Sequence, residues 1–262
     1  MAVFRINFFS QSLQRTVNFN MFIPNDLREG SLEENKVRKT GFFLHGYTGS
    51  SEDFWELTYL AEKYGFAMVM PNGENSFYLD NKATGFGYCT YVGKELVAYV
   101  RKTFGLALTR EDTFLAGLSM GGFGALHTGL SFPENFGRIV ALSSALIVHE
   151  VAKIREGGGN DVANYEYYFR CFDDLKALEE SENNPETLVK RLKEEGKEIP
   201  AIYMACGTED FLLENNREFH RFLEEQQIGH LYLESKGIHD MVFWKEYFEK
   251  SAEWISENKI DQ

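Results

Sequence analysis

The chain has 262 residues, of which 44% are hydrophobic, 15% aromatic and 26% charged, the composition of a globular protein with enough apolar mass for a sizeable core. Its 27 basic and 40 acidic residues give a net charge of −13. Such a surface repels phosphate backbones and anionic lipids, so neither a nucleic acid nor a membrane is expected as a partner.

The three cysteines, Cys89, Cys171 and Cys206, are widely spaced and form no C-x-x-C pair. This pattern argues against a disulfide framework and a zinc site, and it favours reduced thiols. The first residues show neither a long apolar run nor a small-residue cleavage site, so no signal peptide is expected. No stretch approaches the roughly 18 uncharged apolar residues that span a bilayer. We therefore expect a cytoplasmic protein.

Short β-forming runs alternate with helical segments, which favours a mostly parallel sheet with helices on both faces. The first two strands, expected over residues 3–9 and 16–23, have no helix between them and should pair antiparallel. Residues 74–86 are expected to form a loop. Further strands are expected over 41–44, 65–70, 113–116, 136–142, 199–206 and 231–234, and helices over 51–64, 92–104, 121–132 and 241–258. The pattern predicts one α/β domain, residues 1–262, with a sheet of about eight strands.

One segment, residues 144–197, interrupts the alternation and is too long for a simple connection. It contains three consecutive glycines, an acidic helical run, and an aromatic cluster formed by Tyr165, Tyr167, Tyr168 and Phe169. We interpret it as a lid-like insertion over the active edge of the sheet. A pair of surface helices with no catalytic role fits the pattern equally well.

The strongest chemical signal is the run Gly117-Leu-Ser-Met-Gly121, which lies between an expected strand and a helix of small residues. A serine at the apex of a strand-to-helix turn has a strained backbone, and glycines on either side relieve the crowding. The hydroxyl then lies at a helix N-terminus, where developing negative charge is favoured. Ser119 is therefore the expected nucleophile. The alternative is a tight turn in which Ser119 only caps the helix.

A serine hydroxyl needs a base to attack an ester, and the base needs an orienting acid. In open α/β sheets such groups lie on loops after the carboxyl ends of strands. Of the six histidines, His239 follows the last expected strand and is the expected base. Asp210 follows the preceding strand and is preferred as the acid to Glu209, because its side chain is shorter. The order Ser119, Asp210, His239 is that of the α/β-hydrolase fold.

The negatively charged oxygen of a tetrahedral intermediate needs fixed N–H donors. The residue after the nucleophile, Met120, can supply one backbone amide. The His-Gly pair at 45–46 ends an early strand and can turn the amide of Tyr47 towards Ser119.

Aromatic side chains in the loops after the strand at 65–70 are expected to border the substrate pocket. They are Phe77, Tyr78, Phe86 and Tyr88. Such a pocket suits a small acyl chain or a flat phenolic acyl group, although for any one of these residues a place in the core is the alternative.

Several motifs together resemble the esterase D group of α/β-hydrolases, particularly its short-chain tributyrin esterase branch. They are Leu44-His-Gly-Tyr-Thr-Gly-Ser50, Pro71-Asn-Gly-Glu-Asn-Ser-Phe-Tyr78, Leu115-Ala-Gly-Leu-Ser-Met-Gly-Gly-Phe-Gly-Ala125, Cys206-Gly-Thr-Glu-Asp210 and Gly237-Ile-His-Asp240 with Trp244 after it. The resemblance implies the α/β-hydrolase fold, the triad Ser119, Asp210 and His239, and oxyanion amides at Tyr47 and Met120. It does not fix a substrate.

The sequence thus predicts a serine carboxylesterase that acts on short-chain acyl esters without a cofactor or a metal. A feruloyl or acetyl-xylan esterase, with an ester-decorated saccharide as substrate, is the first alternative. An S-formylglutathione hydrolase is disfavoured because no Lys/Arg cluster marks a glutathione carboxylate site. An acyltransferase would need an acceptor motif that is not visible, and an intact triad argues against a non-catalytic binding module. The oligomeric state stays open, a homo-oligomer included.

Overall fold

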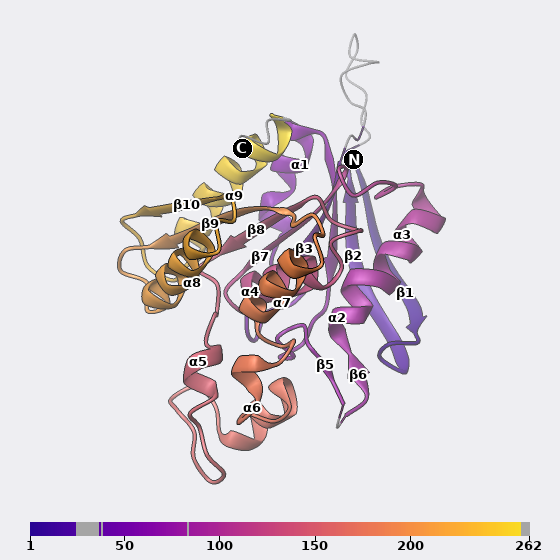
Figure 1. Ribbon diagram of the computed structural model, residues 1–262. Helices are drawn as coiled ribbons and strands as arrows, with labels where there is room; N and C mark the ends of the chain where they lie inside the picture. Colours follow the sequence, from indigo (N-terminus) through magenta and orange to yellow (C-terminus); the bar gives the residue numbers. More distant parts are fainter. Residues whose placement is uncertain (25–36, 38, 83, 258–262) are drawn as a thin grey trace.

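The computed structural model describes residues 1–24, 37, 39–82 and 84–257 (Figure 1). Its central sheet has eight strands in the order β1-β2-β4-β3-β7-β8-β9-β10, which confirms the predicted α/β fold class. β1 and β2 are antiparallel, β2 is antiparallel to β4, and the remaining neighbours are parallel. The strands are β1 (Ala2–Ser10), β2 (Arg15–Ile23), β3 (Lys39–Leu44), β4 (Phe66–Pro71), β7 (Thr113–Leu118), β8 (Arg138–Leu142), β9 (Ala201–Gly207) and β10 (His230–Ser235).

The helical segments connect these strands and cover both faces of the sheet. They are η1 (Trp55–Leu57), α1 (Thr58–Tyr64), α2 (Tyr88–Thr90), the π-helical η2 (Tyr91–Leu96), α3 (Val97–Phe104), α4 (Met120–Ser131), α5 (Val148–Val151), α6 (Tyr165–Phe172), η3 (Leu178–Glu180), α7 (Pro185–Glu194), α8 (Leu213–Glu225) and α9 (Met241–Ser256). None of the helices in the described ranges is long and apolar enough to cross a bilayer.

The sheet separates two hydrophobic clusters, because successive strand residues point to opposite faces. In β3, Phe42 and Leu44 belong to the cluster beneath α3, α4, α7 and α8, whereas Phe43 belongs to the cluster beneath α1 and α9. The ring centroid of Phe43 lies 6.0 Å from that of Phe248 in α9. Both faces are therefore buried, as the near-continuous apolar runs of the parallel strands require.

Several element boundaries differ from the sequence prediction. The helix predicted from residue 51 begins at Trp55, because Ser51 is buried and its hydroxyl accepts a hydrogen bond from the side chain of Asn20 (3.0 Å). Helical structure predicted from residue 92 begins at Tyr88. Within the predicted loop at 74–86, β5 (Asp80–Asn81) pairs with β6 (Phe86–Gly87). The last residue of the helix predicted to end at 258 lies outside the described residues.

The segment 144–197 divides into two parts. The first, with α5 and α6, lies beyond the layers of the sheet (Figure 1), and α6 contacts β5. The second contains α7, which packs against α4 and so belongs to the helical layer over the sheet. The first part reaches the loop after β3, where the ring of Tyr167 in α6 meets that of Tyr47 edge-on at 5.8 Å.

Candidate active site

Ser119 lies at the turn between β7 and α4. Its backbone φ of 54° and ψ of −120° fall in a sparsely populated region that costs about 1–3 kcal/mol and persists only where the surroundings enforce it. Here the amide of Ser119 donates to the carbonyl of Leu142 (2.9 Å), and its carbonyl accepts from the amides of Phe123 and Ala145. The turn is thereby fixed to β8 and to its own helix, with the hydroxyl partly exposed.

The two glycines of the motif are required by close backbone approach. A Cβ atom on Gly117 would lie 2.0 Å from the carbonyl oxygen of Gly121. A Cβ atom on Gly121 would lie 1.9 Å from the carbonyl oxygen of Leu44. No side chain can be accommodated at either position, so the glycines let α4 start directly against the end of β3.

The structure brings His239 and Asp210 to Ser119. His239 Nε2 lies 3.0 Å from the hydroxyl of Ser119, and His239 Nδ1 lies 2.9 Å from Asp210 Oδ2 and 3.1 Å from Oδ1. The two loops that carry them are joined, since the amide of Glu209 donates to the carbonyl of Gly237 (2.9 Å). Glu209 itself is exposed, so the preference for Asp210 agrees with the geometry.

The carboxylate of Asp210 is buried and accepts hydrogen bonds from several donors. Burial opposes its ionisation, but hydrogen bonds from His239, the Leu212 amide and the Ser143 hydroxyl outweigh this effect and hold the pKa of Asp210 below its ordinary value. Asp210 is therefore a carboxylate at neutral pH. A carboxylate only accepts hydrogen bonds, so His239 Nδ1 is the donor to Asp210, and His239 Nε2 faces the Ser119 hydroxyl.

From the sequence alone, no role could be assigned to two residues that contact Asp210 and His239. Trp244 Nε1 donates to the hydroxyl of Ser143 (3.0 Å), and the Trp244 ring meets the imidazole of His239 edge-on at 4.8 Å. Both residues are buried. Ser143 and Trp244 position Asp210 and His239. The contact between Ser143 and Trp244 could not be predicted from a local sequence pattern, because 101 residues separate the two.

The loop after β3 lies beside the serine. A Cβ atom on Gly46 would lie 2.9 Å from Leu118 Cδ1 and at an ordinary van der Waals distance of 3.5 Å from Ser119 Cβ, so the backbone of this loop packs directly against Ser119. The turn that follows is closed by the amide of Gly49, which donates to Gly46, and by the amide of Thr48, which donates to Asn75 Oδ1 (2.8 Å). These two hydrogen bonds fix the backbone on both sides of Tyr47.

Met120 is the first residue of α4. The first amides of a helix have no carbonyl partner within the helix. The amide of Met120 therefore lies at the positive end of the helix dipole, directly after Ser119.

His45 stabilises the loop after β3 through two hydrogen bonds of its ring. The ring is fully buried, its Nδ1 donates to the carbonyl of Gly46 (2.8 Å), and its Nε2 accepts from the amide of Gly73 (2.9 Å). Burial lowers the pKa of His45, which keeps the imidazole neutral as these two bonds require. His45 thus ties the Tyr47 turn to the loop after β4.

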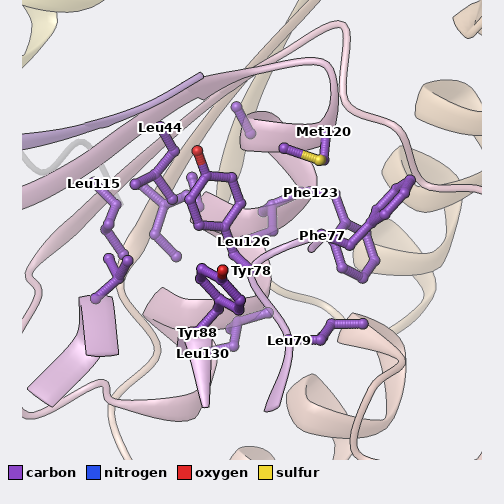
Figure 2. Close-up of a cluster of buried hydrophobic side chains, with 14 of the residues drawn as sticks. Leu44, Phe77, Tyr78, Leu79, Tyr88, Leu115, Met120, Phe123, Leu126 and Leu130 are labelled. Carbon is purple, nitrogen blue, oxygen red and sulfur yellow. The ribbon is translucent and has the colours of Figure 1, made fainter. Parts of the chain in front are cut away.

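The prediction that Phe77 and Tyr78 line the pocket is wrong. Tyr78 is completely buried, and its hydroxyl donates to the carbonyl of His45 (3.2 Å). Phe77 packs edge-on against Phe123, with ring centroids 5.6 Å apart. Figure 2 shows both rings inside the apolar cluster that also contains Met120. They belong to the core beneath the loop after β3, because the turn that carries them points inward.

The other two aromatic residues, Phe86 and Tyr88, lie on the wall of a cavity of about 270 Å³. Tyr167 of α6 also lines it, donates to the carbonyl of Asn75 (2.8 Å), and meets the ring of Tyr47 edge-on at 5.8 Å. The projecting part of segment 144–197 therefore contacts the loop beside Ser119.

The three cysteine thiols offer no second nucleophile. Burial raises the pKa of the thiols of Cys89 and Cys206 to about 12 and that of Cys171 to about 11. The cysteines are free and buried, so they are protonated at neutral pH. No group of three or more His, Cys, Asp or Glu side chains in the described ranges is arranged to hold a metal ion.

Comparisons with known proteins identify the family of this chain. The model of the Esterase family, described as "Putative esterase", matches residues 10–255. An acetyl esterase from Caldicellulosiruptor saccharolyticus is 40% identical over 262 residues, which cover 98% of each chain. The chain therefore belongs to this esterase family; it is an esterase-type α/β-hydrolase and a carboxylic ester hydrolase.

Two solved structures share the whole fold. One is FphF, a fluorophosphonate-binding serine hydrolase from Staphylococcus aureus, with a TM-score of 0.83, 26% identity, and coverage of 98% of this chain and 99% of that one. The other is an S-formylglutathione hydrolase from the same organism, with a TM-score of 0.82, 24% identity and the same coverage.

Proposed function

We propose that this enzyme hydrolyses short-chain acyl esters, acetyl esters above all, through an acyl-enzyme formed on Ser119. The observation that carries the proposal is the pair of contacts on either side of one imidazole: 3.0 Å from Nε2 to the Ser119 hydroxyl and 2.9 Å from Nδ1 to Asp210. The similarity to an acetyl esterase over almost the whole chain supports the choice of acyl group.

In the first half of the reaction, Ser119 Oγ attacks the ester carbonyl carbon while His239 Nε2 takes the hydroxyl proton. The carbonyl oxygen becomes negative, and the amides of Tyr47 and Met120 are the donors we assign to it. Losing one such donor typically costs about a hundredfold to a thousandfold in turnover. The bond to the alcohol oxygen then breaks, and His239 returns the proton to that oxygen.

In the second half, water takes the place of the alcohol. His239 removes one of its protons, the hydroxide oxygen attacks the acyl carbon, and the bond to Ser119 Oγ breaks as the proton returns to it. The products are the carboxylic acid and the free serine. Asp210 stabilises the imidazolium in both halves, and no step calls for a cofactor. We assign the enzyme to the reducing cytoplasm because its three thiols are free.

The test is kcat/KM across p-nitrophenyl acetate, butyrate and octanoate and methyl ferulate, with Ser119→Ala as the blank. We expect the highest values for acetate and butyrate, a collapse at octanoate, and no turnover above background in the blank. A faster reaction with methyl ferulate would transfer the enzyme to feruloyl esters. Equal turnover by Ser119→Ala would refute the mechanism.

A further inference from the structure

Exposed apolar side chains lie on the segments that flank Asp210 and His239 in the sequence, and we call them the collar. It consists of Phe211, Ile238 and Val242, whose relative exposures are 73%, 51% and 78%. Among the large apolar residues that the structure describes, Val242 and Phe211 are the two most exposed. Exposing so much apolar surface in one place is unfavourable unless a ligand covers it.

The collar is built into the loops that carry the acid and the base. Phe211 directly follows Asp210, Ile238 directly precedes His239, and Val242 lies in the first turn of α9. The ring centroid of Phe211 lies 4.5 Å from that of the imidazole, while buried Trp244 contacts the same imidazole at 4.8 Å. His239 thus has a buried aromatic neighbour that positions it and an exposed one that is free to contact a ligand.

The direction of proton transfer determines whether the acyl or the alcohol portion of an ester reaches this collar. The carbonyl oxygen lies towards the Tyr47 and Met120 amides, whereas the alcohol oxygen receives its proton from His239 Nε2 and must come within hydrogen-bond reach of it. The alcohol portion therefore leaves the site over the imidazole, where Phe211 stands.

We propose that Phe211, with Ile238 and Val242, forms the binding surface for the alcohol portion of the substrate and selects alcohols with an apolar chain or ring. This inference rests on the proposed esterase mechanism and names the substrate class within it. The three side chains of the collar are apolar, so an alkyl or aryl alcohol buries apolar surface against them, whereas the hydroxyls of a sugar find no hydrogen-bond partner on them. Phe211 is a specificity-determining residue and takes no part in proton transfer.

The experiment compares hexyl acetate with methyl acetate, which deliver the same acyl group. Each ester is compared with itself in wild type, Phe211→Ala and Phe211→Leu, so that intrinsic reactivity cancels. The matched control is Phe9→Ala, the same substitution at a phenylalanine that is 55% exposed on β1, at the far edge of the sheet. Truncation of Phe211 should lower kcat/KM for hexyl acetate about fivefold through KM, the factor given by burial of roughly 40 Å² of apolar surface.

Methyl acetate should change less than about twofold in Phe211→Ala, Phe211→Leu should recover part of the loss, and Phe9→Ala should match wild type for both esters. An equal loss with both esters would show that Phe211 only orients His239, and no loss with either would show that the alcohol lies elsewhere; both results overturn the proposal. So would sedimentation that shows a wild-type dimer dissociated by Phe211→Ala. In each of these cases the proposed function is tested separately: it holds as long as methyl acetate is hydrolysed and Ser119→Ala abolishes the hydrolysis.

Discussion

Replacing Asp210 by asparagine tests the acid of the candidate triad. The side chain of Asp210 is fully buried, and its carboxylate lies 2.9 Å from His239 Nδ1. An imidazolium formed at that distance gains about 6 kcal/mol from the carboxylate at an effective dielectric constant near 20. The amide of asparagine removes this charge and presents an NH₂ group that favours the wrong tautomer. We expect kcat to fall about 10³- to 10⁴-fold.

The assay is the steady-state hydrolysis of p-nitrophenyl acetate, with folding checked by circular dichroism. Two controls carry the same chemical change. Glu209→Gln alters the neighbouring exposed carboxylate, and Asp240→Asn alters the residue whose side chain accepts from the Val242 and Phe243 amides at the start of α9. Asparagine caps a helix as well as aspartate does, so both controls should stay within about twofold of wild type. A greater loss in Glu209→Gln than in Asp210→Asn would refute the assignment.

Two further predictions concern stability. Gly121→Ala should lower the free energy of unfolding in urea by about 3 kcal/mol or more, because its Cβ would meet the Leu44 carbonyl at 1.9 Å. The control Gly229→Ala, with open space around the new Cβ, should have no effect. Equal stability of the two variants would refute the close packing at Gly121. Burial lowers the pKa of His127 to about 4, and its Nε2 donates to the Glu182 carbonyl. The unfolded chain then binds a proton that the folded one does not, so stability present above pH 6.5 is lost towards pH 4, by roughly 3 kcal/mol in all. His127→Gln should remove this loss; an unchanged pH dependence would contradict it.

The order of elements and the position of the site could be predicted because they depend on local rules. Ser119 is marked by glycines that a tight turn demands, and Asp210 and His239 follow strands whose carboxyl ends meet at one edge. The burial of Phe77 and Tyr78 could not be predicted, since an aromatic residue in an irregular loop has the same local pattern whether it points in or out. Both have positive φ, at 53° and 55°, and this backbone turns their rings into the core.

The most direct measurement is to react the enzyme with an alkyl fluorophosphonate and to locate the adduct by mass spectrometry of the digested protein. An activated serine should gain one phosphonyl group, on the peptide that contains Ser119, and His239→Gln should abolish this labelling. Labelling at another residue, or undiminished labelling of Ser119→Ala, would contradict the assignment of Ser119 as the nucleophile.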